Sequence, residues 1–230
     1  MKISCTSFSC NESISSNKMG LEDFIELCGT FGITGVELWD EHVEKYISQN
    51  GTINKLEKLI KDLGLDLITI AVNNHDFSSP NKQDRDEDLK KVLNWLDIVE
   101  KLGCKILRVL PGDLIKLNED EGKYYPYVVE CFNECVKKAE ELGIVLAVEN
   151  CPKNTDPFVV NKLIKEFETP YLRTCPDIGN IREDIRYSAF KPLIPCAVNV
   201  HAKTYDFDSE GEETSISYEK VMNILKEADY

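Results

Sequence analysis

Residues 141–150 read Glu-Leu-Gly-Ile-Val-Leu-Ala-Val-Glu-Asn, and the fold class can be inferred from this stretch. A segment with apolar residues at helical spacing ends at Gly143, and the apolar run 144–148 follows at once. Glycine is common directly after a helix because the left-handed backbone there carries no Cβ penalty for it. A continuous apolar run predicts a strand buried on both faces, as in a parallel sheet that is covered by helices.

The same unit recurs along the chain, where Gly32, Gly64 and Gly103 each separate an amphipathic segment from a short apolar strand. The strands predicted in this way are 2–7, 35–38, 66–72, 105–110, 144–149, 172–176 and 197–201. Seven strands alternating with helices predict an α/β fold, which is either a (β/α)8 barrel or a doubly wound open sheet. No glycine-rich phosphate-binding motif follows any of these strands, which favours the barrel.

Composition narrows the class of protein. The chain has 230 residues and a formal net charge of −14, and a surface rich in carboxylates argues against binding to nucleic acid. No apolar run approaches the roughly 20 residues that a membrane span needs, and the N-terminus has no signal-peptide pattern. Nine cysteines at irregular spacing indicate small core residues in a reducing compartment. We therefore expect one cytoplasmic domain over residues 1–230.

Candidate functional residues are the polar side chains at the carboxyl ends of the predicted strands, because barrel enzymes carry their active sites there. Glu149, Asp177 and His201 end or follow three successive strands. Carboxylate and imidazole ligands on one rim suit a single divalent ion such as Mn²⁺, Mg²⁺, Co²⁺ or Zn²⁺. The alternative is that hydrogen bonds within the barrel satisfy each side chain separately.

Three further residues are candidates for contact with a substrate. Lys203 shares the strand parity of His201 and can reach a carbonyl or anionic oxygen; its alternative is an ion pair with Glu37. Arg108 can hold a carboxylate or phosphate, or serve as a counter-ion in the barrel core. Trp39 can stack on a sugar face, or simply pack. His42 is expected at the surface.

Four short motifs carry a resemblance to a known family. They are Gly35-Val36-Glu37-Leu38, Val148-Glu149-Asn150, Pro176-Asp177-Ile178-Gly179-Asn180 and Val200-His201-Ala202-Lys203. In this order they resemble the xylose isomerase-like TIM barrel superfamily and, within it, the sugar phosphate isomerase/epimerase family. The resemblance covers essentially the whole chain.

The resemblance implies a metal-dependent isomerase or epimerase that acts on a sugar or sugar phosphate through an enediolate. It implies one divalent ion held by Glu149, Asp177 and His201, with Glu149 also the candidate base. From its strand position beside His201, we expect Lys203 to be a second catalytic group. It places His75 near the substrate, although a loop-capping role is equally expected. Asn180 stands where many sugar epimerases have a histidine, so it can bind a hydroxyl but cannot carry a proton.

The sequence also departs from the family pattern. The family's fourth metal ligand is a Glu on the eighth strand, and we expect a barrel that lacks this strand because the last helical segment reaches Tyr230. Two alternatives therefore stay open, a polyol (inosose-type) dehydratase on the same metal site and a catalytically impaired binding protein. An endonuclease-type phosphodiesterase is not expected from a chain with three histidines. An open sheet edge favours a homodimer.

Overall fold

The computed structural model describes residues 2–153 and 155–230. Its strands form one sheet in the order β1-β2-β3-β4-β5-β6, and each strand pairs in parallel with the next. The strands are β1 (Ser4–Thr6), β2 (Gly35–Trp39), β3 (Asp66–Ala71), β4 (Ile106–Val109), β5 (Val145–Glu149) and β6 (Leu172–Cys175). The sheet is thus the parallel sheet of a barrel, and six of the predicted strands are confirmed; five are shorter than predicted, and β2 is one residue longer.

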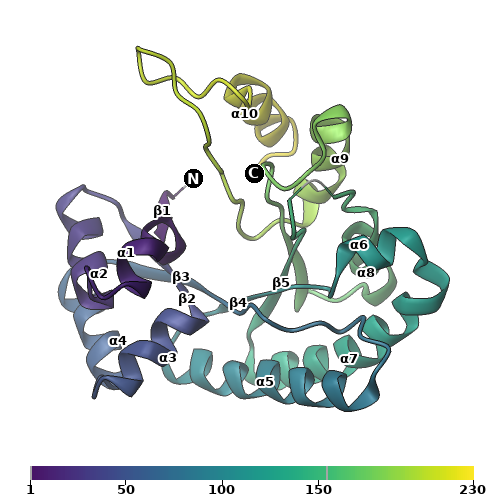
Figure 1. Cartoon of the computed structure of the whole chain (residues 1–230), viewed down its shortest axis with the longest axis horizontal. Coiled ribbons are helices and arrows are strands. Elements are labelled where there is room, and N and C mark those ends of the chain that lie inside the picture. The colour runs from purple at the N-terminus through teal and green to yellow at the C-terminus, as the bar shows by residue number, and fades with distance from the viewer. Residues whose placement is uncertain (1, 154) are drawn as a thin grey trace.

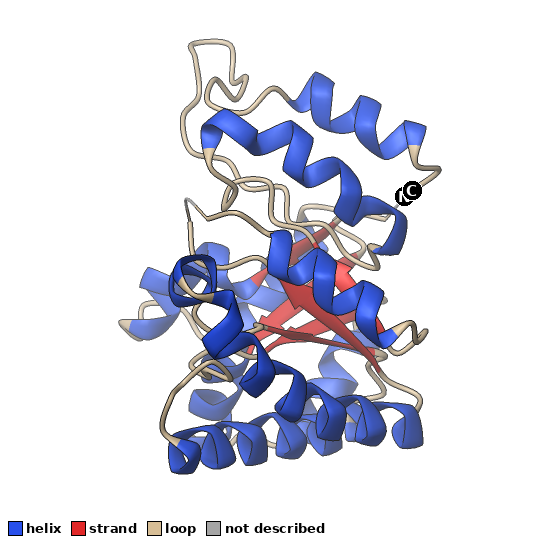
Figure 2. Ribbon diagram, turned by 90° about the vertical axis from the view of Figure 1, so that its right-hand side faces the viewer, coloured by secondary structure: helices blue, strands red, loops and turns tan. Residues whose placement is uncertain are grey.

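Helices cover the outside of this curved sheet (Figures 1 and 2). The α-helices are α1 (Asn11–Ser15), α2 (Leu21–Thr30), α3 (Asp40–Ser48), α4 (Ile53–Asp62), α5 (Lys82–Lys101), α6 (Leu114–Glu119), α7 (Glu121–Leu142), α8 (Phe158–Phe167), α9 (Arg186–Phe190) and α10 (Tyr218–Glu227). Short 3₁₀ helices are η1 (Ser7–Cys10), η2 (Glu183–Ile185) and η3 (Lys191–Cys196). The apolar residues of β5 are buried almost throughout, as expected for a strand covered on both faces.

The prediction of a regular strand at 197–201 is wrong. This segment pairs with β6 and its extension only through two isolated bridges, Thr174 with Ala197 and Asp177 with His201. The segment has one residue more between the two bridges than its partner has, and the Val200 amide donates to the Asn199 side chain instead of to a neighbouring strand. An extra residue of this kind interrupts a ladder as a β-bulge does. The described residues contain no eighth strand, as expected.

A second irregularity lies beside β2. Val36 pairs with Leu67 and Glu37 pairs with Thr69, so Ile68 is the extra residue of a bulge in β3. A Cβ atom on Gly35 would lie 2.7 Å from Ile68 Cγ1, which explains why glycine occupies this position. The bulge sits next to Glu37, and bulges commonly change the direction in which nearby side chains point.

His42 is buried, and its expected place at the surface is wrong. Its side chain bridges η1 and α1, with Nδ1 2.9 Å from Ser7 Oγ and Nε2 3.0 Å from Asn11 Oδ1. Because the Asn11 oxygen can only accept, Nε2 donates to it and the Ser7 hydroxyl donates to Nδ1. Burial, with a smaller effect of Lys45, lowers the pKa of His42 to about 4. The ring is therefore neutral in the folded protein.

This buried histidine predicts a specific acid sensitivity. The unfolded chain binds a proton at His42 near pH 6.5, whereas the folded chain binds it only near pH 4. Stability is therefore full above pH 6.5 and falls as the pH drops toward 4, by up to about 1.4 kcal/mol per pH unit. Urea unfolding of wild type and His42→Gln between pH 7 and 4 should show a shallower slope in the variant. Equal slopes would contradict a neutral buried ring.

Candidate metal centre

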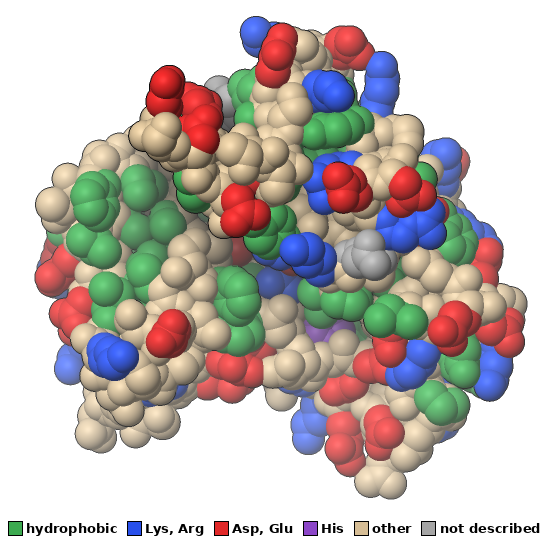
Figure 3. Space-filling view, turned by 45° about the horizontal axis from the view of Figure 1, so that its top comes forward, with side chains coloured by type: hydrophobic (Ala, Val, Ile, Leu, Met, Phe, Trp, Pro, Cys, Tyr) green, Lys and Arg blue, Asp and Glu red, His purple; other side chains and the backbone are tan. Residues whose placement is uncertain are grey.

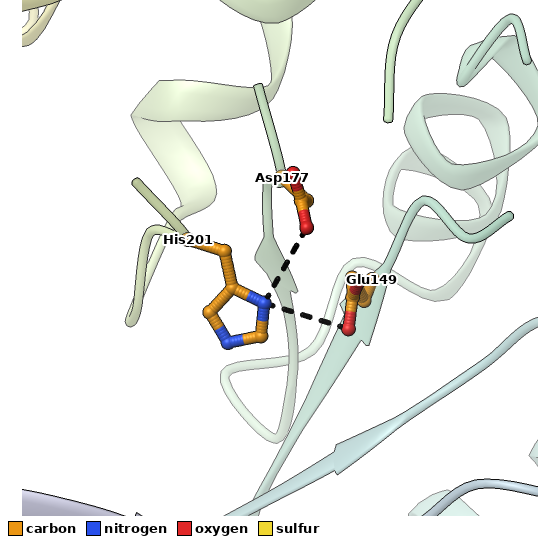
Figure 4. Close-up of side chains that lie close together, drawn as sticks. All are labelled: Glu149, Asp177 and His201. Atoms are coloured by element: carbon orange, nitrogen blue, oxygen red, sulfur yellow. Dashed lines mark ion pairs between the residues drawn. The ribbon is translucent and has the colours of Figure 1, made fainter. Parts of the chain in front are cut away.

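Glu149, Asp177 and His201 meet at the carboxyl ends of the strands (Figure 4). Glu149 is the last residue of β5, and Asp177 follows β6. One ligating atom from each residue lies within 4.8 Å of the other two. His201 Nδ1 is 3.5 Å from Glu149 Oε2 and 3.9 Å from Asp177 Oδ2. The structure thus brings together the three residues that the sequence singled out for a metal ion.

Local hydrogen bonds orient Asp177. The buried Asn150 side chain accepts from the Asp177 amide at 2.8 Å and donates to its carbonyl at 2.9 Å, which ties the end of β5 to the end of β6. Asp177 Oδ1 accepts from the Gly179 and Asn180 amides. The other oxygen, Oδ2, is buried and forms an ion pair with Lys203 Nζ at 2.8 Å. A metal ion at this oxygen would share it with the ammonium or displace the ammonium.

Two cations neutralise the carboxylates. Arg108 Nε lies 2.9 Å from Glu149 Oε2, and both side chains are buried. Lys203 donates to Asn180 Oδ1 at 2.9 Å, and Asn180 Nδ2 donates to Glu149 Oε1 at 3.1 Å. Burial alone would raise the pKa of Glu149, but Arg108 and His201 outweigh burial and lower that pKa to about 2. Burial and the negative Glu149 raise the pKa of Asp177 despite Lys203.

Glu37 is a member of this cluster that the sequence analysis did not assign to it. Its Oε2 atom lies 3.0 Å from His201 Nε2, whereas the sequence analysis considered Lys203 as its partner. Burial lowers the pKa of His201, but Cys175, Glu37 and Glu149 together raise it well above the ordinary value. A carboxylate within the apolar strand β2 was the available signal, because buried carboxylates require a partner.

The other predicted substrate contacts have structural partners in this conformation. His75 Nε2 accepts from the Leu110 amide at 3.1 Å, and Nδ1 lies 3.4 Å from the Asn73 carbonyl. Burial lowers the pKa of His75 to about 4, so the ring is neutral. These contacts are those of a loop cap, and a substrate role for His75 stays a prediction. Arg108 also donates to the Val72 carbonyl and to Asn73 Oδ1.

Trp39 lies at the end of β2 against aromatic neighbours. Its ring meets Phe8 edge-on at 4.9 Å and His42 at 5.0 Å between ring centroids. The indole Nε1 is buried and has no hydrogen-bond partner among the described residues. Stacking of Trp39 on a substrate stays a prediction.

A cavity of about 730 Å³ lies at the opposite end of the sheet. Lys2, Asp66 and Lys105 line it near the amino ends of β1, β3 and β4. Tyr230 lines the same cavity as Lys2, and the two chain ends lie near each other in Figures 1 and 2. Its lining includes none of Glu149, Asp177 and His201, so this cavity is separate from the candidate metal centre.

The surface carries the acidic excess of the chain. Figure 3 shows acidic side chains spread over one face, and a central hollow in which Lys or Arg and His side chains are visible. Within the described ranges, no helix combines the length and the apolar character that crossing a bilayer requires.

Comparisons with known proteins agree with this fold. A family model described as xylose isomerase-like TIM barrel matches residues 25–230. No curated protein matches the chain significantly. A D-tagatose 3-epimerase-like protein superposes with a TM-score of 0.76 at 20% identity, over 100% of this chain and 88% of that one.

Two other solved structures are similar to a comparable degree. The probable 3-DHS dehydratase AsbF from Bacillus anthracis has a TM-score of 0.74 at 16% identity, over 100% of this chain and 90% of that one. The IOLI protein with a binding zinc atom has a TM-score of 0.74 at 14% identity, over 99% of this chain and 85% of that one. At these identities the likeness shows the fold.

The Arg108–Glu149 pair predicts a measurable stability effect. Arg108→Leu leaves Glu149 buried without its guanidinium, so the variant should lose about 3–5 kcal/mol of unfolding free energy in urea with EDTA present. The double variant Arg108→Leu/Glu149→Gln should recover part of the loss. The control is Arg182→Leu, which removes an exposed pair with Asp184 and should cost about 1 kcal/mol or less. Equal losses of unfolding free energy in Arg108→Leu and Arg182→Leu would contradict the conclusion that Arg108 compensates the buried charge of Glu149.

Proposed function

The chain belongs to the xylose isomerase-like TIM barrel family, and from this premise we propose that it is a metal-dependent isomerase or epimerase acting on a sugar or sugar phosphate. The observation that carries the proposal is the convergence of Glu149, Asp177 and His201 at the carboxyl ends of the strands. Similarity to a D-tagatose 3-epimerase-like protein supports the same reaction class.

The donor set fits one divalent ion of the Mn²⁺, Mg²⁺, Co²⁺ or Zn²⁺ type. Glu149 and Asp177 offer carboxylate oxygens, His201 offers Nδ1, and Asp177 Oδ2 already holds a cation, the Lys203 ammonium, at 2.8 Å. A bound ion supplies Lewis acidity, which stabilises negative charge that develops on substrate oxygens. The zinc atom in the IOLI structure supports an ion in this kind of barrel.

Glu149 and Lys203 are the proposed acid–base groups. Glu149 is ionised at neutral pH, the state that a base must have, although Arg108 lowers its pKa to about 2 and so makes it a weaker proton acceptor. Burial would lower the pKa of Lys203, but Asp177 and Glu149 raise it, so its ammonium remains a proton donor. Asn180 links the two groups by hydrogen bonds and offers its amide to a hydroxyl.

The remaining proposals concern substrate contacts, location and assembly. Arg108, His75 and Trp39 are proposed to contact the substrate from the ends of neighbouring strands and their loops. The nine cysteines are free, which supports a reducing, cytoplasmic compartment. The outer edge of β1 has no strand partner within the described sheet, which supports a homodimer.

A dehydratase acting on a polyol is the second candidate function. It is supported by the similarity to the probable dehydratase AsbF, whose TM-score is within 0.02 of that of the epimerase-like protein. Removal of a proton beside a carbonyl can begin either reaction, so the same base serves both. A binding protein without catalytic activity is the third candidate function.

Metal analysis tests the centre directly. After dialysis against Mn²⁺, elemental analysis should find one ion per wild-type chain, and Glu149→Gln or His201→Ala should abolish binding because each removes a ligand. His42→Gln, which changes a buried histidine outside the centre, should retain the ion. Unchanged stoichiometry in the first two variants would contradict the proposal.

Isotope exchange separates the candidate reactions. With Mn²⁺ in deuterium oxide, NMR should detect exchange of a carbon-bound proton in a ketose or ketose phosphate. Glu149→Gln should slow it by about 10²–10⁴-fold, the usual contribution of a general base. Loss of water from a cyclic polyol ketone, without exchange in the ketoses, would favour the dehydratase. If the protein catalyses neither reaction with any compound of the panel, the result would favour a binding protein.

A further inference from the structure

Glu37 and His201 contact each other across the barrel mouth, although 164 residues separate them in the chain. We propose that Glu37 is a positioning residue, which holds the His201 ring so that Nδ1 faces Glu149 and Asp177. The inference rests on the metal centre proposed above and adds a residue that acts on the ion only through His201.

Glu37 contacts two side chains of the segment 197–201. Glu37 is 3% exposed, and its Oε2 atom lies 3.0 Å from His201 Nε2. The same oxygen accepts from Asn199 Nδ2 at 3.1 Å. Asn199 and His201 both belong to the segment 197–201, which has only two isolated bridges in the described structure. Side-chain contacts with Glu37 therefore help to place this segment against the rest of the barrel.

The chemistry of the pair selects one ring nitrogen. A carboxylate can only accept, so a neutral imidazole must carry its hydrogen on Nε2 to bond with Glu37. The lone pair then resides on Nδ1, the nitrogen that lies 3.5 Å from Glu149 Oε2 and 3.9 Å from Asp177 Oδ2. Partners of this kind orient histidine ligands, and their loss commonly weakens metal affinity about 10–100-fold.

The competing interpretation makes Glu37 a counter-ion of Arg108 in the barrel core. The structure favours His201, because Glu37 lies within ion-pair distance of His201 and Arg108 lies within that distance of Glu149. Arg108 Nη1 donates to the Val72 carbonyl and to Asn73 Oδ1. Removal of Glu37 should therefore affect the imidazole first.

The test is Co²⁺ affinity, measured from the visible absorption of the bound ion during titration of the whole chain. Glu37→Leu should weaken Co²⁺ binding by about 10–100-fold and change the absorption bands, because the ring is no longer held. Glu37→Gln retains the side-chain length and an accepting oxygen, so its affinity should lie between Leu and wild type. Thermal melts without metal report whether each variant is folded.

Asp40→Asn is the matched control. Asp40 is a fully buried carboxylate directly after β2, paired with Lys91 at 3.0 Å, and it has no ion pair with His201. This variant should bind Co²⁺ as tightly as wild type, so a general loss of buried charge is separated from the loss of positioning. If Glu37→Leu is unfolded, weakened binding and shifted bands in the folded Glu37→Gln protein carry the inference.

The outcomes distinguish this inference from the proposed function. Wild-type affinity and bands in folded Glu37→Leu or, failing that, in Glu37→Gln, with binding lost in His201→Ala, would overturn positioning and leave the metal centre in place. An equal loss in Asp40→Asn would also overturn it. No Co²⁺ binding by the wild-type protein would overturn both.

Discussion

Compensation of three buried carboxylates is the constraint on which the barrel mouth depends. Glu37, Glu149 and Asp177 are each at most 4% exposed, and burying them without partners would cost far more than a domain of this size can tolerate. The compensating side chains are Arg108, Lys203 and His201. Arg108 joins β4 to β5, which the backbone ladder also pairs, whereas His201 and Lys203 tie the poorly paired stretch after η3 to Glu37 of β2 and to Asp177.

The same charges explain why a divalent ion suits this mouth. Once His201 loses a proton, as a metal ligand must, the three carboxylates exceed the two fixed cations by one negative charge, so one divalent ion would leave a single positive charge. A net positive centre favours reactions in which negative charge develops on substrate oxygens. Isomerisation, epimerisation and dehydration beside a carbonyl all share this property, which is why the site supports a reaction class more strongly than a particular substrate.

Local signals made most of the fold predictable, and long-range contacts account for what was missed. Glycines after helices and continuous apolar runs located β1 to β6, because both signals depend on neighbouring residues. Glu149, Asp177 and His201 were predicted to lie together because each ends or follows a predicted strand. The extra residue near Asn199 has no local signature, so a regular seventh strand was expected. The burial of His42 depends on Ser7 and Asn11, more than 30 residues away. The Glu37–His201 contact joins residues that are 164 positions apart, so no local pattern indicated it.

Anomalous diffraction from crystals soaked in Mn²⁺ tests the central claim most directly, because it locates an ion without assuming a reaction. We expect one strong peak among Glu149, Asp177 Oδ2 and His201 Nδ1, with His201 Nε2 still bonded to Glu37. A peak elsewhere, or no peak at these residues at saturating Mn²⁺, would rule out a metal centre here. In that case Arg108, Lys203 and a protonated His201 would be the lasting partners of the carboxylates.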